Sequence, residues 1–153
     1  MSEQTKPKIL IVDDDQFLLD MYALKFKQSG FDVDAAMGSV DALNKVKNGT
    51  TADVVVSDVV MPAMDGFEFI DAVKKGGFLP NACFVILSNL GQQSDIDKGN
   101  ELGVDGYIVK ASATPSEVVA KITELINTKV CPKPFAERPG EPAMAGFSPK
   151  PSI

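Results

Sequence analysis

Short apolar segments rich in β-branched residues alternate with longer segments of helical period from Lys8 to about Asn127. This alternation is typical of βαβ units and predicts a parallel sheet covered by helices. The first, third and fourth apolar segments contain almost no polar residue, which favours central strands buried on both faces. The second alternates apolar with acidic residues, which favours an edge strand. We predict strands at 8–12, 31–36, 53–57, 83–87 and 105–109.

Glycines and one capping motif mark the ends of the helices. Glycine takes at least cost the left-handed conformation that commonly ends a helix, and one follows four of the helical segments, at Gly30, Gly49, Gly76 and Gly103. The last helix begins with a capping box between Thr114 and Glu117, with Pro115 at the first helical position. We predict helices at 16–29, 39–48, 65–75, 94–102 and 115–127, and an α/β fold with a doubly wound, five-stranded parallel sheet.

The composition restricts the class of protein. A chain of 153 residues, 44% of them apolar, suits one globular domain. The net charge of −6 and the lack of a basic block argue against nucleic acid or an anionic membrane surface as a direct partner. We expect the polar N-terminus to be neither a signal peptide nor a membrane span. Cys83 and Cys131 lack metal-binding spacing, so we expect free thiols and a cytoplasmic protein.

The composition changes after Asn127. Six of the ten prolines lie between Val130 and Ile153, where no apolar period is sustained. We therefore predict a polar segment at 1–7, a folded domain at 8–127 and a proline-rich extended tail at 128–153. This tail would suit either a complete protein or a linker cut from a longer one.

Polar side chains follow four of the predicted strands where each strand ends. In a doubly wound parallel sheet these ends share one edge, which is where ligands bind. Clustered carboxylates repel one another, and a hard divalent cation relieves the repulsion, so Mg²⁺ is the expected metal and Mn²⁺ a competent substitute. Such a site, with a lysine and a hydroxyl, suits phosphoryl transfer to a carboxylate. The residues are Asp13, Asp14, Asp58, Ser88 and Lys110.

The absence of histidine removes several kinds of chemistry. The chain contains no histidine, so it has neither a Ser-His-Asp centre nor a phosphohistidine of its own. Any phosphorus chemistry must therefore use a carboxylate or a hydroxyl group.

Taken together, these motifs resemble the receiver domain of two-component response regulators, especially single-domain receivers of the chemotaxis type. The resemblance covers about residues 7–127 and rests on ILIVDDD at 9–15, SDVVMPAMDG at 57–66, Ser88 and YIVK at 107–110. It implies the flavodoxin-like receiver fold with strand order 2-1-3-4-5. It also implies a phosphorylation-dependent signalling switch, not an enzyme, whose only reactions are its own phosphorylation and slow dephosphorylation.

The resemblance gives the acidic residues distinct roles. Asp58 would accept a phosphoryl group from a sensor histidine kinase, a histidine phosphotransfer protein or a small phosphodonor. Asp13 and Asp14 would bind the metal, together with Asp58 and the backbone carbonyl of Val60.

The resemblance assigns the remaining residues to the response. Ser88 and Lys110 would contact the phosphoryl group. Ser88 and Tyr107 would form a two-state switch that changes the face made by the fourth helix, fifth strand and fifth helix, where a downstream protein target would bind.

Two features differ from the usual pattern of the family. Ala111 follows Lys110, where a proline in a cis bond is usual, and a cis bond before a non-proline residue costs about 3 kcal/mol. The residues two positions beyond Asp58 and Ser88 are Val60 and Leu90, both apolar, where a polar side chain could orient attacking water. We therefore predict slow self-dephosphorylation.

A phosphatase of the haloacid-dehalogenase type is the alternative function, because DDDQF at 13–17 partly matches the DxDxT motif of that class. Asp13 would then be the nucleophile and Asp15 the general acid. Phe17 at the Thr position weighs against this alternative, Asp58 would have no role, and Asp15 suits the N-cap of the next helix better. A flavodoxin-like binding module is a third reading, but no Ser/Thr-rich phosphate loop follows the first strand.

Overall fold

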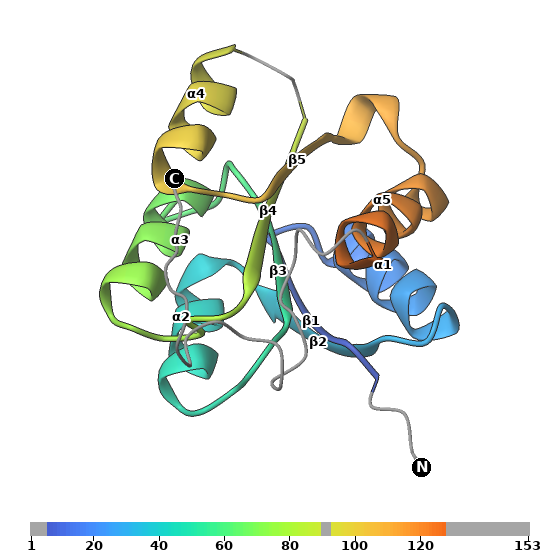
Figure 1. Ribbon diagram of the computed structural model, residues 1–153, viewed down its shortest axis with the longest axis horizontal. Coiled ribbons are helices and arrows are strands. Elements are labelled where there is room, and N and C mark those ends of the chain that lie inside the picture. Colours follow the sequence, from blue (N-terminus) through green and yellow to red (C-terminus); the bar gives the residue numbers. More distant parts are fainter. Residues whose placement is uncertain (1–5, 90–92, 128–153) are drawn as a thin grey trace.

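The computed structural model describes residues 6–89 and 93–127, and the predicted tail lies outside them. Figure 1 shows strands alternating with helices along the chain. The strands are β1 (Lys8–Asp13), β2 (Asp32–Met37), β3 (Val54–Asp58), β4 (Cys83–Ser88) and β5 (Gly106–Val109). The helices are α1 (Gln16–Gln28), α2 (Ser39–Lys47), α3 (Gly66–Lys75), α4 (Gln93–Leu102) and α5 (Pro115–Asn127), with a 3-10 helix, η1 (Lys110–Ser112), before α5.

The strands form one parallel sheet in the order β2-β1-β3-β4-β5, as predicted. The chain passes from β1 to β2 on one side and then places β3 on the other side of β1, so the strand order reverses between β1 and β3. Every residue of β3 and β4 is buried, whereas β2 lies at an edge and buries only Ala36. The contrast between apolar and alternating segments therefore located the central and edge strands correctly.

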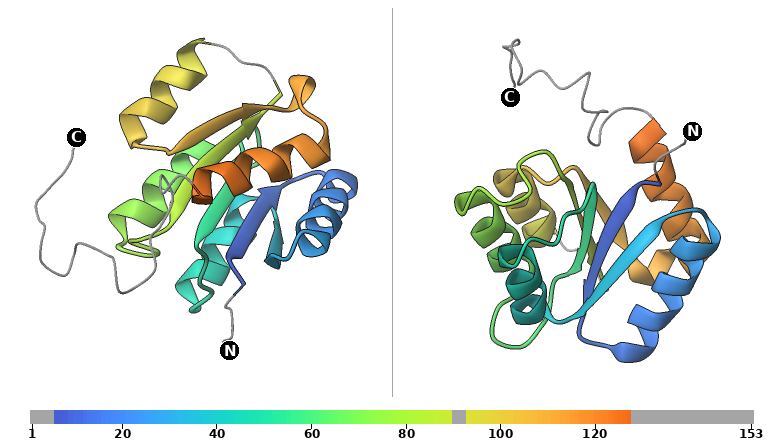
Figure 2. Two further views of the ribbon diagram at one scale, coloured as in Figure 1. Left: turned by 45° about the vertical axis from the view of Figure 1, so that its right-hand side comes forward. Right: turned by 90° about the horizontal axis from the view of Figure 1, so that it is seen from below.

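Two helical layers cover the sheet, with α1 and α5 on one face and α2, α3 and α4 on the other (Figures 1 and 2). Successive side chains of a strand point to opposite faces, so Ile9 and Ile11 pack with α1 and α5 while Leu10 and Val12 pack with α2 and α3. Both faces of the central strands are thus removed from water. Polar groups can then reach solvent chiefly at the strand ends.

The helices end at the four marked glycines, and three of these glycines take the left-handed conformation. Gly76 has a φ of −78°, and the left-handed residue is its neighbour Gly77, with a φ of 73°. Gly76 follows α3 directly, as predicted, but two consecutive glycines stand there and the second of them takes the left-handed conformation. The capping box of α5 is confirmed, since Thr114 N donates to Glu117 Oε1 at 2.8 Å and Glu117 N donates to Thr114 Oγ1 at 3.2 Å.

Cys83 is the first residue of β4, and its side chain packs in the core beneath α1 and α5. It is 1% exposed and disulfide-bonded. The expectation of a free thiol is therefore wrong at Cys83. Cys131 lies outside the described residues.

No helix among residues 6–89 and 93–127 combines the length and apolar character needed to cross a membrane.

Candidate functional site

Three aspartates meet at the carboxyl ends of β1 and β3, where the strand order reverses. Val12 of β1 pairs with Ser57 of β3, so the two strands end level and Asp13 lies beside Asp58. One carboxylate oxygen from each of Asp13, Asp14 and Asp58 lies within 4.8 Å of the other two. Asp13 and Asp58 are buried, at 1% and 6% exposure, whereas Asp14 is exposed. The predicted acidic cluster is therefore present, with one carboxylate open to solvent.

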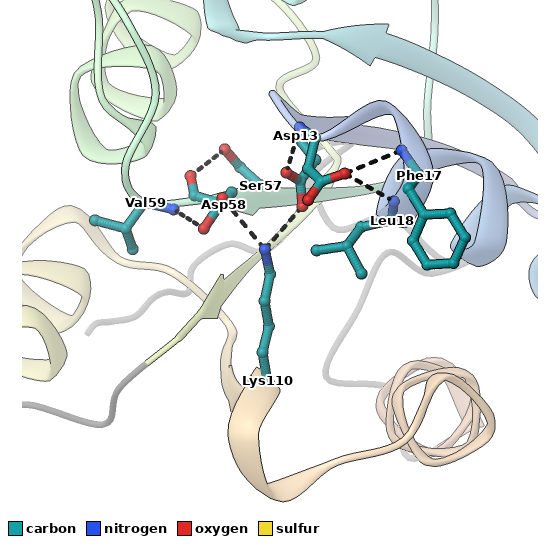
Figure 3. Close-up of polar contacts among 8 residues, drawn as sticks. Asp13, Phe17, Leu18, Ser57, Asp58, Val59 and Lys110 are labelled. Atoms are coloured by element: carbon teal, nitrogen blue, oxygen red, sulfur yellow. Dashed lines mark hydrogen bonds and ion pairs between the residues drawn. The ribbon is translucent and has the colours of Figure 1, made fainter.

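Lys110 extends from the end of β5 into this cluster (Figure 3). Its Nζ lies 2.8 Å from Asp13 Oδ2 and 3.2 Å from Asp58 Oδ2. No cis peptide bond occurs among the described residues, and the backbone instead continues from Lys110 into the 3-10 helix η1. Lys110 thus reaches both aspartates although Ala111 replaces the proline that usually follows this lysine.

The carboxylate of Asp58 is held by its own backbone neighbour. Val59 N donates to Asp58 Oδ1 at 2.8 Å, and Lys110 contacts the other oxygen. Burial raises the pKa of Asp58, and the charge of Asp13 raises it further, while the charge of Lys110 and the Val59 N–H oppose the rise. The net rise means that the protein alone does not fully compensate a negative charge at this position.

Two other groups respond to the charges in the cluster. Burial by itself would lower the pKa of Lys110, but its hydrogen bond to Asp13 and the charges of Asp58 and Asp13 outweigh burial and raise it. Tyr22 of α1 is 4% exposed, and burial raises the pKa of its hydroxyl in the field of Lys110, Asp13 and Asp58. Tyr22 is a neighbour of the site that the sequence does not predict. The sequence predicts that Tyr22 lies on the apolar face of α1, but it does not predict that this residue lies near the acidic cluster.

Asp15 serves as the N-cap of α1. Its Oδ1 accepts from Phe17 N at 3.0 Å and from Leu18 N at 3.3 Å, and its own N–H donates to Asp13 Oδ1 at 3.0 Å. A carboxylate that caps a helix in this way is committed to backbone donors. The capping role is therefore confirmed, and the phosphatase alternative is not favoured because its general acid is occupied.

The loop from β3 to α3 is held tightly against the cluster. A Cβ atom added to Gly66 would lie 2.1 Å from the backbone oxygen of Asp58, so only glycine fits there. Gly66 N donates to Val59 O at 2.8 Å, and the hydroxyl of buried Ser39 at the start of α2 donates to Met64 O. The sequence marks the turn but not these contacts, which depend on α2 lying beside α3.

The remaining predicted residues lie at the carboxyl ends of the strands or in the neighbouring part of β5. Ser88 ends β4, is 4% exposed and pairs with Val109, the residue before Lys110. Tyr107 is half-buried and packs on the core beneath α2, α3 and α4. Val60 has a side chain that is 73% exposed. Leu90 lies outside the described residues.

A cavity of about 250 Å³ lies at the opposite edge of the sheet. It is lined by residues that include Lys8, Asp53 and Ala82, which lie at or just before the amino ends of β1, β3 and β4. This cavity is therefore separate from the acidic cluster.

The sheet order, the acidic cluster and the lysine agree with one known family. The model of the response regulator receiver domain matches residues 9–123. This chain belongs to that family. The chain is thus a response regulator receiver domain of two-component systems, as predicted from its sequence.

Relatives of known sequence support the assignment. This receiver domain is 32% identical over 124 residues to the probable transcriptional regulator ycf27 of Guillardia theta. The match covers 81% of this chain and 47% of that protein. It is 30% identical over 132 residues to the alkaline phosphatase synthesis transcriptional regulatory protein PhoP of Bacillus subtilis, covering 85% of this chain and 52% of that protein. The chain spans about half the length of these curated relatives.

A solved structure shows the same fold. The chemotaxis protein CheY4 of Vibrio cholerae, crystallised at low pH, superposes with a TM-score of 0.72 at 28% identity and covers 78% of this chain and 98% of that chain. The receiver domain therefore shares its fold with this chemotaxis protein.

Proposed function

We propose that this receiver domain is a phosphorylation-dependent switch that accepts a phosphoryl group on Asp58. The observation that carries the proposal is the position of the Asp58 carboxylate. It lies at the end of a fully buried strand, in reach of the ammonium group of Lys110 and beside two further carboxylates. A carboxylate so placed is a nucleophile surrounded by groups that neutralise an incoming phosphoryl group.

In the proposed reaction, an Asp58 carboxylate oxygen attacks phosphorus and forms an oxygen–phosphorus bond. The bond from phosphorus to a histidine nitrogen, or to the oxygen of a small acyl phosphate, breaks and the donor leaves with its electron pair. Asp58 Oδ1 is already oriented by Val59 N. Lys110 balances charge on the phosphoryl oxygens, and the hydroxyl of Ser88 at the end of β4 hydrogen-bonds to one of them.

The same residues fit a magnesium site. Mg²⁺ prefers oxygen ligands and keeps several of its waters, and the cluster offers three carboxylates with Asp14 facing solvent. We assign Asp13, Asp14, Asp58 and the backbone carbonyl of Val60 to this ion, with Mn²⁺ as a substitute. When bound, the ion would neutralise negative charge that the protein alone leaves uncompensated, in keeping with the raised pKa of Asp58.

Acetyl phosphate provides the direct test. The full chain is incubated with acetyl phosphate and Mg²⁺, and the modified residue is located by mass spectrometry in the wild type, in Asp58→Asn and in the control Asp53→Asn. We expect one phosphoryl group on Asp58 in the wild type and in the control, and none in Asp58→Asn. Phosphate on Asp13, or turnover of acetyl phosphate that survives the loss of Asp58, would instead support the phosphatase alternative.

The phosphodonor in the cell has to be another protein or a small molecule, because this chain contains no histidine. Four apolar residues at or just after the carboxyl ends of β1, β2 and β3 are exposed: Phe17 at 73%, Met37 at 46%, Val40 at 47% and Val60 at 73%. Met37 ends β2 beside Asp13, and the other three residues follow β1, β2 and β3, at the same edge of the sheet as Asp58. We assign this apolar rim to docking of a histidine kinase or histidine phosphotransfer protein. Phe17→Ser should slow transfer from such a protein but leave phosphorylation by acetyl phosphate unchanged.

A downstream protein would bind a different surface of the domain from the phosphodonor. Tyr107 packs near Gly99 of α4, since a Cβ added to Gly99 would lie 4.0 Å from Tyr107 Cδ2. We assign Ser88 and Tyr107 to the switch, and the face of α4, β5 and α5 to a downstream protein. Amide hydrogen exchange before and after phosphorylation should change in α4 and β5. An unchanged exchange pattern there would contradict the assignment.

Slow self-dephosphorylation also follows from the site. The exposed Val60 side chain offers no hydrogen bond to a water that attacks the phosphoryl group. The phosphorylated wild type should decay over minutes or longer, and Val60→Asn should decay faster. A wild-type half-life of seconds would contradict this expectation.

A further inference from the structure

The start of α2 links the two segments that carry the predicted metal ligands. Gly38 N donates to Asp13 O at 3.0 Å, and the hydroxyl of Ser39 donates to Met64 O in the loop from β3 to α3. Ser39 is 0% exposed, so this contact is closed to water. Residues 38 and 39 therefore join the end of β1 to the loop after β3.

The carbonyl of Met64 depends on Ser39. Within residues 6–89 and 93–127, Ser39 is the one residue that donates a hydrogen bond to Met64 O. Met64 is half-buried, packs against the core beneath α2 and α3, and directly precedes Asp65, the N-cap of α3. A carbonyl that has given up water is destabilised when its donor is removed. Loss of the Ser39 hydroxyl should therefore disturb the backbone just before α3.

The turn before Met64 is strained. Ala63 has a φ of 71°, in the left-handed region that residues other than glycine seldom adopt. Met64 N donates to Pro62 O at 2.8 Å and closes a γ-turn around Ala63. A strained turn persists only where surrounding contacts hold it, and the Ser39 hydroxyl holds the residue directly after Ala63.

One carbonyl in this loop is left for a ligand. Gly66 N donates to Val59 O at 2.8 Å, and Ser39 holds Met64 O, so the loop is fixed at both ends. Between these points, Val60 O accepts no hydrogen bond from any described residue. This carbonyl is the backbone ligand that we assign to Mg²⁺. Its direction depends on the conformation of the turn that follows it.

We propose that Ser39 is a positioning residue for the metal site. Its hydroxyl holds the strained turn at Ala63 and so keeps the Val60 carbonyl in place relative to Asp13. Ser39 does not contact the reacting groups and acts through the loop. The inference rests on the proposed function, because it takes the Val60 carbonyl as a metal ligand.

The strain at Ala63 makes the effect of Ser39 depend on a second residue. Without the hydroxyl, an alanine at position 63 should relax out of the left-handed region and carry the Val60 carbonyl with it. Glycine adopts this region without steric cost, so Ala63→Gly should keep the turn even when the hydroxyl is absent. The effect of Ser39→Ala should thus be smaller in the Ala63→Gly background.

Calorimetric titration with Mg²⁺ measures this dependence. The full chain is compared as the wild type, Ser39→Ala, Ala63→Gly and the double variant. We expect the affinity for Mg²⁺ to fall about fivefold in Ser39→Ala, the effect of one lost hydrogen bond. It should stay near the wild-type value in Ala63→Gly and fall less than about twofold from Ala63→Gly to the double variant.

Thr123→Val is the matched control, because it removes another hydroxyl that donates to a backbone carbonyl, Val119 O at 2.8 Å in α5. Its Mg²⁺ affinity should equal that of the wild type. An unchanged affinity in Ser39→Ala, or an equal fall in both backgrounds, would overturn the proposal. A fall in the control as large as in Ser39→Ala would do the same.

Amide hydrogen exchange in metal-free buffer separates this inference from the proposed function. The Met64 N–H, which closes the turn, should exchange at least about fivefold faster in Ser39→Ala than in the wild type. Adding Ala63→Gly should restore its protection, and the Leu19 N–H of α1 should not change. A wild type that bound no Mg²⁺ would contradict the proposed metal site itself. A wild type that bound Mg²⁺, with equal Met64 exchange in Ser39→Ala, would overturn only the role of Ser39.

Discussion

At the amino ends of its strands the sheet uses aspartates to accept backbone N–H groups, whereas at the carboxyl ends it gathers aspartates around one lysine. Asp53 Oδ2 accepts from Lys8 N at 2.9 Å, and Asp105 Oδ2 accepts from Phe84 N at 2.9 Å. Asp13 and Asp58 instead share the ammonium group of Lys110. The first pair completes the hydrogen bonding of the sheet, while the second concentrates charge that one lysine cannot balance.

Two carboxyl groups, one buried at Asp58 and one half-buried at Asp105, show this difference directly. Burial is the largest cause of the raised pKa at both Asp58 and Asp105. At Asp105 the N–H of Phe84 and the charge of Lys74 oppose the rise. At Asp58 the charge of Asp13 adds to the rise. A desolvated carboxyl is therefore stabilised by a backbone N–H and a lysine at one end of the sheet, and stands beside a second carboxylate at the other.

The largest expected effect comes from removing the shared cation. Lys110→Met should lower the free energy of unfolding in metal-free buffer by about 3 kcal/mol, because two buried carboxylates lose their partner. The matched control is Lys45→Met, which breaks a pair with Asp34 whose side chains are 34% and 40% exposed and should cost under about 0.5 kcal/mol.

Urea denaturation measures both variants. Adding Mg²⁺ should restore part of the stability lost in Lys110→Met, since a cation then replaces the ammonium group, and should not affect Lys45→Met relative to wild type. Equal losses of unfolding free energy in the two variants would show that the buried cluster depends on its lysine no more than an exposed ion pair does.

A steric change at the same end should be next in size. Gly66→Ala places a methyl group 2.1 Å from the backbone oxygen of Asp58, and the forced shift should cost about 2 kcal/mol. The control Gly30→Ala meets nothing within 4 Å but keeps a φ of 94°, which should cost about 1 kcal/mol.

The two glycine variants differ most clearly in Mg²⁺ binding. Calorimetric titration should show weaker binding in Gly66→Ala, because the Asp58 backbone moves, and unchanged binding in Gly30→Ala. If both variants bound Mg²⁺ like the wild type, the close packing at Gly66 would have no bearing on the cluster.

Removal of one exposed carboxylate should change Mg²⁺ affinity at the carboxyl ends of the strands but not at their amino ends. Asp14 is exposed, so Asp14→Asn removes one carboxylate without disturbing the core. We expect Mg²⁺ affinity to fall about tenfold, equal to about 1.4 kcal/mol. Asp53→Asn changes a carboxylate at the amino end and should leave the affinity unchanged. Titration calorimetry measures both, and an equal fall in the two variants would contradict a site confined to the carboxyl end.

The smallest effect concerns the pH dependence of stability. A carboxyl whose pKa is raised on folding stabilises the native state most at low pH, where it is protonated. That stability is lost as pH rises from the ordinary carboxyl pKa of about 4 through the raised folded pKa. Asp105→Asn and Asp58→Asn should therefore both be more stable than the wild type at pH 7 in metal-free buffer, with the gap closing at lower pH.

Magnesium distinguishes these two variants. A ligand that binds only the folded state stabilises it, so Mg²⁺ should favour the wild type over Asp58→Asn and leave the advantage of Asp105→Asn unchanged. Urea denaturation at several pH values with and without Mg²⁺ checks this. An advantage of Asp58→Asn that persists in saturating Mg²⁺ would contradict the assignment of Asp58 to the metal.

The sequence predicted local structure well because its signals are local. The apolar run before Asp58 and the alternating run before Gly38 differ in pattern, and that difference placed β3 inside the sheet and β2 at its edge. The cap at Asp15 was readable from a single residue beside a helical period. The end of α3 at Lys75 was predicted correctly, but the left-handed residue after it is Gly77 and not Gly76, and the sequence of two consecutive glycines does not choose between them.

The sequence by itself determined the five parallel strands, their helices and the set of polar residues at the strand ends, because periodicity and caps act over a few positions. Tertiary structure alone decided three contacts between distant segments: Lys110 on Asp13 and Asp58, Tyr22 in the field of that cluster, and Gly66 against Asp58. It also corrected the state of Cys83. Such contacts depend on how crossovers and helical layers bring remote residues together, and no local pattern records that geometry.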